Sequence, residues 1–172
     1  MTGTPHKAIL SLGSNIGDRT DWLNQATQAL AALPGTEVTA HSSIYETEPV
    51  NVPESFKNET FLNTVVIIKT TLHVEQLSDA IHKIEDYLQR VRTLPNQPRT
   101  IDIDIITFDK LVSDDSNLTL PHPRAHLRRF VLQPLSELEP DFILPEHLKT
   151  VTELLKALPH SPASKLEPTQ YC

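Results

Sequence analysis

Two carboxylates stand two residues apart in the otherwise apolar run Arg99-Thr100-Ile101-Asp102-Ile103-Asp104-Ile105-Ile106. β-Branched residues dominate this run, which is typical of a β-strand, where residues i and i+2 point to the same side. Asp102 and Asp104 are therefore expected side by side on one face, with the isoleucines on the other. Adjacent carboxylates repel each other, and burying them unpaired is costly. A divalent cation would offset that cost, since Mg²⁺ commonly binds one or two carboxylates together with substrate phosphates.

Arginines gather around the carboxylate pair in the sequence. Six of the seven lie between positions 90 and 129: Arg90, Arg92, Arg99, Arg124, Arg128 and Arg129. Arginine is well suited to bidentate contacts with phosphate, so this concentration predicts a local anion site beside a metal. Two plainer readings stay open on these residues alone. The carboxylates could lie on the solvated face of an edge strand, and the arginines could stand at the ends of surface helices.

Composition limits the class of protein. The chain has 172 residues, a net charge of -7, only 4 glycines and 1 cysteine, Cys172. The length suits one domain over 1–172, with a core of about 7–145 and a frayed tail over 159–172. The acidic balance argues against nonspecific nucleic-acid binding, and no glycine-rich phosphate loop is present. With no internal disulfide, no secretory signal and no membrane-spanning apolar run, we expect a cytoplasmic protein.

The hydrophobic periodicity predicts alternating strands and helices. In chain order, we expect a strand over Lys7–Leu12, a helix from Asp18 or Thr20 to about Leu33, a strand over Glu37–Glu46, a strand over Phe61–Leu72, a helix over Val74–Arg92 and the Asp-x-Asp strand. Val38, Ala40, Ser42 and Ile44 are expected on one side of the second strand. The order β-α-β-β-α-β predicts an α+β, ferredoxin-like core, an antiparallel sheet with both helices on one face. A C-terminal extension adds a helix from about Ala125 and a short one near Val151.

Six segments of the chain also occur together, in this order, in one family. They are Ser11-Leu12-Gly13-Ser14-Asn15, Ser43-Ile44-Tyr45-Glu46-Thr47-Glu48-Pro49-Val50, Phe61-Leu62-Asn63, Glu85 with Arg90-Val91-Arg92, Pro98-Arg99-Thr100-Ile101-Asp102-Ile103-Asp104-Ile105, and Leu120-Pro121-His122-Pro123-Arg124 with Arg128-Arg129-Phe130-Val131-Leu132. The stretch from about Ala8 to Asp141 resembles the 6-hydroxymethyl-7,8-dihydropterin pyrophosphokinases of folate biosynthesis. The resemblance implies an enzyme that transfers pyrophosphate from ATP to the pterin hydroxyl, giving the pterin diphosphate and AMP.

The resemblance also implies a role for each matching residue. Asp102 and Asp104 would hold two Mg²⁺ ions on the ATP phosphates, and Arg92 and Arg99 would clamp the transferring group. These four are the catalytic candidates. The remaining ATP-binding candidates are Glu85, Arg90, Ile105, Thr119, His122 and Arg128. The pterin-binding candidates are Phe61 and Phe130, which would stack on the ring, Asn63, which would bind its edge, and Thr47 and Val50, which would offer backbone groups.

Elementary chemistry fits the pterin assignment, because a flat heteroaromatic ring suits aromatic faces and an amide offers both donors and an acceptor. Asn63 is unusual within a strand, which favours function. On sequence alone, however, Phe61 reads as core, Phe130 could be helix packing, and Glu85 would normally lie on a solvated helix face. The segment Thr93–Pro98 and Asn51 depart from the family's pattern.

Three alternatives remain at this stage. A glycosyltransferase could use an Asp-x-Asp pair, although such enzymes usually need a larger fold. A diverged relative could bind pterin or nucleotide with little turnover, and a ferredoxin-like regulatory module would have no catalysis. For the enzyme, we expect ATP and the hydroxymethyl-dihydropterin as partners, no nucleic acid, no membrane, and a monomer or weak homodimer.

Overall fold

A computed structural model describes residues 3–49, 52–90, 98–161 and 163–165 of the chain. Its elements are β1 (His6–Ser14), α1 (Arg19–Ala31), β2 (Thr36–His41), β3 (Tyr45–Thr47), η1 (Glu54–Phe56), β4 (Phe61–Thr70), α2 (Val74–Tyr87), β5 (Asp102–Phe108), β6 (Ser113–Asp115), β7 (Leu118–Leu120), η2 (Ala125–Leu127), α3 (Arg129–Leu138), α4 (Val151–Ala157) and β8 (Ala163–Lys165).

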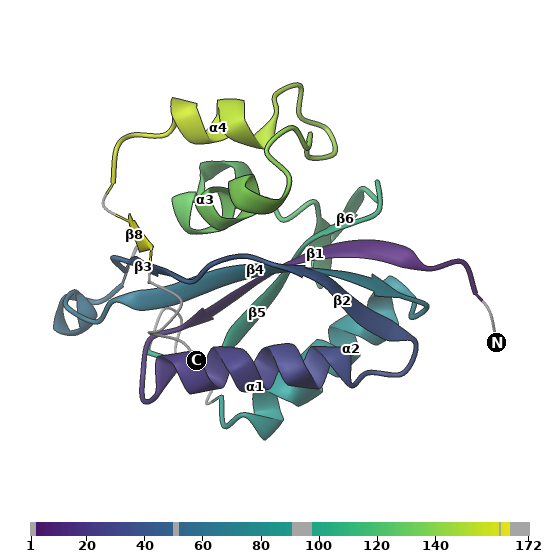
Figure 1. The fold of residues 1–172 in the computed structure, drawn as a ribbon, viewed down its shortest axis with the longest axis horizontal. Helices are drawn as coiled ribbons and strands as arrows, with labels where there is room; N and C mark the ends of the chain where they lie inside the picture. Colours follow the sequence, from purple (N-terminus) through teal and green to yellow (C-terminus); the bar gives the residue numbers. More distant parts are fainter. Residues whose placement is uncertain (1–2, 50–51, 91–97, 162, 166–172) are drawn as a thin grey trace.

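The main sheet has the order β5-β1-β4-β3-β8, with β2 also pairing with β4. Its ladders are antiparallel. Helices α1 and α2 cover one face of the sheet, and α3 and α4 cover the other (Figure 1). This arrangement confirms the predicted α+β, ferredoxin-like core with its first two helices on one face. Among the described residues, no helix has the length and apolar character needed to cross a membrane.

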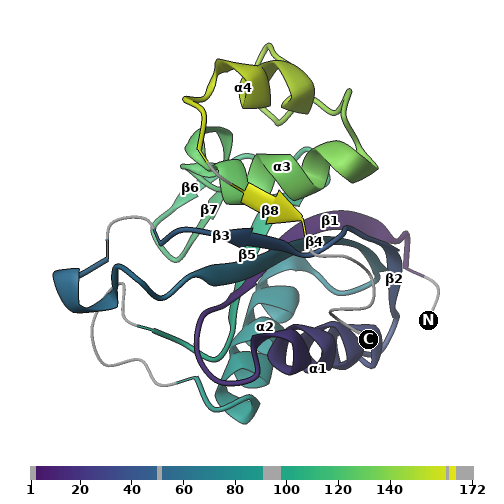
Figure 2. The same ribbon diagram turned by 60° about the vertical axis from the view of Figure 1, so that its left-hand side comes forward.

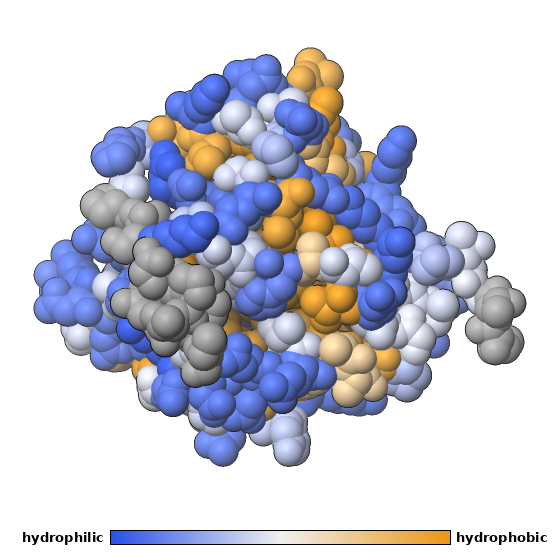
Figure 3. Space-filling model, viewed as in Figure 1, coloured by the Kyte–Doolittle hydropathy of each residue, from blue (hydrophilic) through white to orange (hydrophobic). Residues whose placement is uncertain are grey.

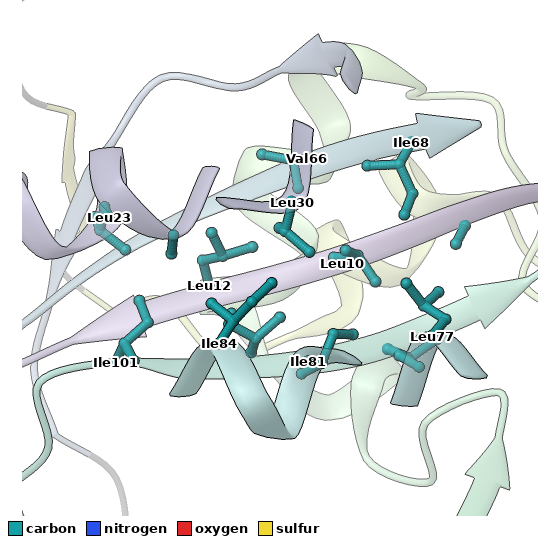
Figure 4. Packing of buried hydrophobic residues seen from close by; sticks show 14 of the residues in the cluster. Leu10, Leu12, Leu23, Leu30, Val66, Ile68, Leu77, Ile81, Ile84 and Ile101 are labelled. Atoms are coloured by element: carbon teal, nitrogen blue, oxygen red, sulfur yellow. The ribbon is translucent and has the colours of Figure 1, made fainter. Parts of the chain in front are cut away.

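The sheet is buried on both sides, because each face carries its own apolar cluster. Figure 4 shows the cluster under α1 and α2, where leucines and isoleucines of the two helices meet apolar residues of β1 and β4 and Ile101, which directly precedes β5. The second cluster joins Ile9, Val65 and Ile106 of the sheet to Leu132 and Leu135 of α3. Two packed faces hold β1, β4 and β5 rigidly, and the polar residues at one end of these strands therefore have fixed positions.

The predicted strand over Glu37–Glu46 is two strands, β2 and β3. The register of β2 against β4 shifts between Val38 and Ala40. Val38 therefore packs in the α1/α2 cluster, whereas Ala40 packs in the α3/α4 cluster. The prediction that both lie on one face is wrong, because a β-bulge adds one residue and inverts the alternation after it.

Two predicted boundaries also differ. Helix α2 ends at Tyr87, earlier than the predicted Arg92, and Gln89 has a φ of 65°, the left-handed conformation that commonly follows a helix end. Within the tail that the sequence predicts to be frayed, Ala163–Lys165 forms β8 and pairs with β3. Figure 2 shows β8 between α3 and the sheet edge. On the face seen in Figure 3, hydrophilic residues cover most of the surface.

Candidate active site

The paired carboxylates of β5 point away from the α1/α2 core. Ile101, Ile103 and Ile105 are buried in that core. The side chains of Asp102 and Asp104 lie on the opposite face with 26% and 33% exposure. The predicted separation of carboxylates and isoleucines is confirmed, and it places both carboxylates on the face that α3 covers.

Arginines from three separate segments reach these carboxylates. Arg90 Nη1 lies 2.6 Å from one oxygen of Asp102, and Arg99 Nη1 lies 3.2 Å from the other. Arg128 Nη1 lies 3.7 Å from Asp104 Oδ2. All three arginine side chains are at least four-fifths buried, so water screens these pairs less than it screens surface pairs. The cluster therefore combines two adjacent negative groups with three cations that could turn toward an anion.

Glu85 fixes this cluster from behind. Its side chain is buried, accepts a hydrogen bond of 2.9 Å from the Ile103 backbone N–H, and pairs with Arg90. The interpretation of Glu85 as part of a solvated helix face is wrong, because α2 docks on β5 along this side. Glu85 does not line any of the three cavities described below. Its contacts are those of a residue that positions Arg90 and β5.

The electrostatics of Asp104 fit a cation ligand. Burial in the cavity, followed by the negative charge of Asp102, raises the pKa of Asp104 to about 7, against the opposing effect of Arg128. A bound cation would offset the repulsion between the Asp102 and Asp104 carboxylates, which favours the protonated form of Asp104. No group of three or more acidic, His or Cys side chains suited to a metal exists among the described residues. Two adjacent carboxylates are a number that Mg²⁺ commonly takes from a protein.

His122 stands at the mouth of the same cluster. Its backbone N–H donates to the Ile106 carbonyl oxygen over 2.9 Å, which holds the Pro-His-Pro corner against β5. Burial and the positive charges of Arg128 and Arg124 lower the pKa of His122 to about 4. The imidazole is therefore neutral near pH 7, and it can accept or donate one hydrogen bond at each nitrogen according to its tautomer.

This pKa predicts how acid affects the fold. An unfolded chain takes up the His122 proton below about pH 6.5, whereas the folded protein takes it up only near pH 4. The stabilisation is thus present at neutral pH and is lost as the pH falls from about 6.5 to about 4. We expect the free energy of unfolding, measured in urea, to fall less over this range for His122→Gln than for wild type. The exposed His160→Gln is the control, and equal slopes for all three proteins would contradict the assignment.

A cavity of about 430 Å³ connects this cluster with the predicted pterin residues. Its lining includes ten of the sequence-predicted residues: Thr47, Phe61, Asn63, Arg90, Arg99, Asp102, Asp104, His122, Arg128 and Phe130. They come from β3, β4, β5, the start of α3 and the connecting segments. Residues distant in the sequence thus line one volume of ligand size.

A side cavity of about 230 Å³ adjoins the large one, and Asp104 and His122 line both. Ile105 and Thr119, two predicted ATP-binding residues, line the side cavity, together with Ile103 and residues of α2. The lining of the large cavity is mostly polar near the carboxylates, whereas the side cavity offers isoleucines beside polar groups. The pair of cavities suits a ligand with a charged part and a flat, less polar part.

The aromatic end of the large cavity is tightly built. Asn63 is 3% exposed, and its Nδ2 donates to Thr47 Oγ1 over 2.6 Å. A Cβ atom at residue 13 would lie 2.9 Å from Asn63 Oδ1, which is too close. Glycine at this position therefore allows the Asn63 amide to keep its position. Phe130 lines the cavity with its ring centre 5.2 Å from Arg128 Cζ, and it also packs against the α3/α4 cluster.

Several lining residues were not predicted. Ser11, Gly13, Glu48, Val52, Arg124 and Leu127 also line the large cavity. Antiparallel pairing places Ser11 opposite Asp104 and Gly13 opposite Asp102, so a correct strand register would have found these two from the sequence. Arg92 and Val50, which the resemblance assigns to ATP and pterin, lie outside the described residues.

The comparisons with known proteins agree with this geometry. The model of the family described as 7,8-dihydro-6-hydroxymethylpterin-pyrophosphokinase (HPPK) matches residues 9–140. A Bacillus subtilis protein named 2-amino-4-hydroxy-6-hydroxymethyldihydropteridine pyrophosphokinase is 43% identical over 131 residues, which is 76% of this chain and 77% of that protein. A Methylorubrum extorquens protein of the same name is 39% identical over 161 residues, which is 94% of this chain and 99% of that protein.

A solved structure supports the fold. The crystal structure of wild-type Plasmodium falciparum HPPK-DHPS matches with a TM-score of 0.69 at 14% identity, over 90% of this chain and 45% of that chain. This chain thus spans less than half of that longer protein. The family model covers most of the chain, and the two relatives exceed 35% identity over most of their own length. The chain therefore belongs to the 7,8-dihydro-6-hydroxymethylpterin-pyrophosphokinase family.

Proposed function

We propose that the large cavity is the active site for transfer of pyrophosphate from ATP to the hydroxyl of 6-hydroxymethyl-7,8-dihydropterin, the reaction of this family in folate biosynthesis. The aromatic end, with Phe61, Asn63 and Phe130, would take the pterin. The charged end, with Asp102 and Asp104, would take the polyphosphate of ATP. The side cavity, which shares Asp104 with the large one, would take the nucleoside of ATP.

One observation supports this assignment above the others. A single cavity holds two adjacent carboxylates, several arginines and a buried amide beside two aromatic rings. A glycosyltransferase or a regulatory module has no need for this combination. Pyrophosphate transfer needs all of these groups, because the site must hold the hydroxyl oxygen of the pterin close enough to the β-phosphorus of ATP for a bond to form.

Asp102 and Asp104 are the proposed ligands of two Mg²⁺ ions, with ATP phosphates as the remaining partners. When bound, Mg²⁺ neutralises phosphate charge and polarises the phosphorus under attack. The arginines pair with these carboxylates in the structure. Cation binding by the carboxylates would release Arg90, Arg99 and Arg128, which could then bind phosphate oxygens.

The proposed chemistry depends on positioning and charge. The pterin hydroxyl oxygen attacks the β-phosphorus of ATP, and AMP leaves with the α-phosphate. Negative charge then builds on the oxygen that bridges the α- and β-phosphates. Arg99 and Arg128, two of the arginines that line the cavity, would stabilise this charge. Fixed cations in a cavity that excludes water stabilise such charge more than water does. His122, neutral at pH 7, could donate a hydrogen bond to a phosphate oxygen.

The amide of Asn63 has a testable role in pterin selection. We expect Asn63→Leu to lower kcat/KM about a hundredfold or more, mostly through KM for the pterin, because buried polar groups of a ligand would lose their partner. The KM for ATP should stay within about twofold of wild type. Asn24→Leu on α1 is the matched control. Steady-state kinetics with each substrate varied separately measures both values, and an unchanged pterin KM would refute the role.

The function itself is tested by product analysis. We expect AMP to form when the protein is incubated with Mg·ATP and 6-hydroxymethyl-7,8-dihydropterin, and not when the pterin or Mg²⁺ is left out. Formation of ADP, or AMP without need of the pterin, would reject the proposal.

Two further expectations join this proposal. ATP as a substrate supports the cytoplasm as the location. For the oligomeric state, we propose a monomer or weak homodimer.

A further inference from the structure

Residues 158–161 and 163–165 of the C-terminal segment cover the outer edge of the proposed pterin site. We call these residues the strap. Its strand β8 pairs antiparallel with β3, and Thr47 lies opposite Ala163 on one side and opposite Phe61 of β4 on the other. β3 has only three residues, and an edge strand of that length is weakly held by itself. The strap therefore gives the wall that contains Thr47 a second hydrogen-bonded neighbour.

Arg129 holds the beginning of the strap to α3. Its Nη2 donates to the carbonyl oxygens of Leu158, over 3.4 Å, and Pro159, over 3.1 Å. Its Nη1 lies 3.3 Å from Gln133 Oε1 on the next turn of α3. A guanidinium is suited to this because its planar fork serves several acceptors at once. Arg129 directly precedes Phe130, so the residue that holds the strap adjoins the aromatic wall of the site.

The end of the strap contacts α3 a second time. Lys165 Nζ lies 3.6 Å from Glu137 Oε1. Glu137 also accepts hydrogen bonds from the Tyr45 hydroxyl and, over 3.1 Å, from the Ser43 backbone N–H. The strap is thus linked to α3 at both of its ends, and α3 is linked to β3 through Glu137.

A cavity of about 240 Å³ lies between the strap and the large cavity. Thr47, Glu48, Leu127, Arg128 and Phe130 line both cavities, while Leu158, Pro159 and Ser161 of the strap line only the outer one. This space is not filled by side chains, so the two walls do not pack directly against each other here. The hydrogen bonds of the strap add a constraint on their separation to the one that Glu137 provides through Tyr45 and Ser43.

We propose that Arg129 is a positioning residue for the pterin: by holding the strap, it sets the spacing between the Thr47 wall and the Phe130 wall. This inference rests on the proposed function, because it takes the large cavity as the pterin site. The strap lies beyond residues 9–140, the part matched by the family model. Arg129, which holds the strap, lies within the matched part, so the device links the matched core to the C-terminal extension of this chain.

The test compares three full-length variants with wild type. For Arg129→Leu we expect the KM for the pterin to rise about fivefold or more, with kcat and the KM for ATP within about twofold. Arg129→Lys should give an intermediate pterin KM, because one ammonium replaces the fork only in part. Lys156→Leu, which removes an exposed cation from α4, should match wild type. If Arg129→Leu does not fold, the pterin KM of Arg129→Lys is the test. A value above that of wild type supports the inference, and a value equal to it contradicts the inference.

Several results would overturn the inference. A lower melting temperature with an unchanged pterin KM would show a structural role only, and a raised KM for ATP would show that Arg129 acts on the nucleotide. Wild-type protein that makes no AMP would reject the proposed function but not the strap. Amide hydrogen exchange would then test the strap by itself. We expect the β3 amides to exchange faster in Arg129→Leu than in Lys156→Leu. Equal exchange in the two variants would contradict the role of the strap.

Discussion

Replacement of Asp104 by asparagine is expected to lower kcat/KM at least about a thousandfold while the protein stays folded. The change keeps the size of the side chain and removes the negative charge that a cation needs. Asp102 alone would then face the metal and the polyphosphate of ATP. Steady-state production of AMP at saturating Mg²⁺ measures the loss, and raising the Mg²⁺ concentration further should not restore wild-type activity.

The stability of this variant gives an independent check. The pKa of Asp104 is raised from 3.8 to about 7 in the folded protein, so stability from its proton is lost as the pH rises through this range. Asparagine has no such proton, and ligand-free Asp104→Asn should melt at or above the wild-type temperature at pH 8. Mg·ATP should raise the melting temperature of wild type and of the exposed control Asp114→Asn more than that of Asp104→Asn. Near-wild-type turnover by Asp104→Asn would refute the metal role.

Replacement of Arg99 by methionine is expected to lower kcat about a hundredfold or more, with a smaller effect on the KM for the pterin. Arg99 is the cation that enters the cavity directly before β5. Two hydrogen bonds hold its backbone to Asn15. The Arg99 backbone N–H donates to Asn15 Oδ1 over 2.7 Å, and the Asn15 backbone N–H donates to the Arg99 carbonyl oxygen over 3.2 Å. The substitution should therefore remove the guanidinium without moving the strand. Single-turnover measurement of AMP formation isolates this chemical step.

Lys110, an exposed cation beyond the other end of β5, provides the control for charge removal. Lys110→Met should keep kcat within about twofold of wild type. If Arg99→Met changed only the KM for ATP and left kcat unaltered, Arg99 would bind the ground state and the transition state equally, and its proposed catalytic role would be wrong.

Local pattern was enough to predict much of the fold. The run that contains Asp102 and Asp104 alternates so clearly that its two faces follow from strand geometry alone. The N-cap of α1 is Asp18, whose side chain accepts from the Asp21 N–H, as the predicted helix start requires. These features depend on residues close together in the sequence, which is why they can be predicted.

Features that depend on distant contacts could not be predicted in this way. The bulge between Val38 and Ala40 leaves no mark on the alternation and arises from pairing with β4. Glu85 and Asp86 are equivalent by sequence, and only the docking of α2 on β5 buries Glu85. The pairing of β8 with β3 is equally long-range, because three residues carry too little pattern to predict a strand.

In the candidate site, too, some features could be predicted from the sequence and others depend on distant contacts. The resemblance named ten residues that the structure brings to one cavity. Spacing alone left Phe130 open between packing and substrate contact, because the rotation of α3 about its axis decides which way the ring points. Ser11 was missed, since its place in the cavity depends on the register of β1. Arg124 was predicted only as one of a group of arginines, since its place in the cavity depends on the corner after β7.

The most direct test of the account follows the phosphates of ATP through one turnover. The protein is mixed with the hydroxymethyl-dihydropterin, Mg²⁺ and ATP that has one label on the α-phosphate and a different label on the γ-phosphate. Attack at the β-phosphorus predicts that the α label appears in AMP and the γ label in the pterin diphosphate, in equal amounts. Recovery of the α label in ADP, or of the γ label in free phosphate, would contradict it.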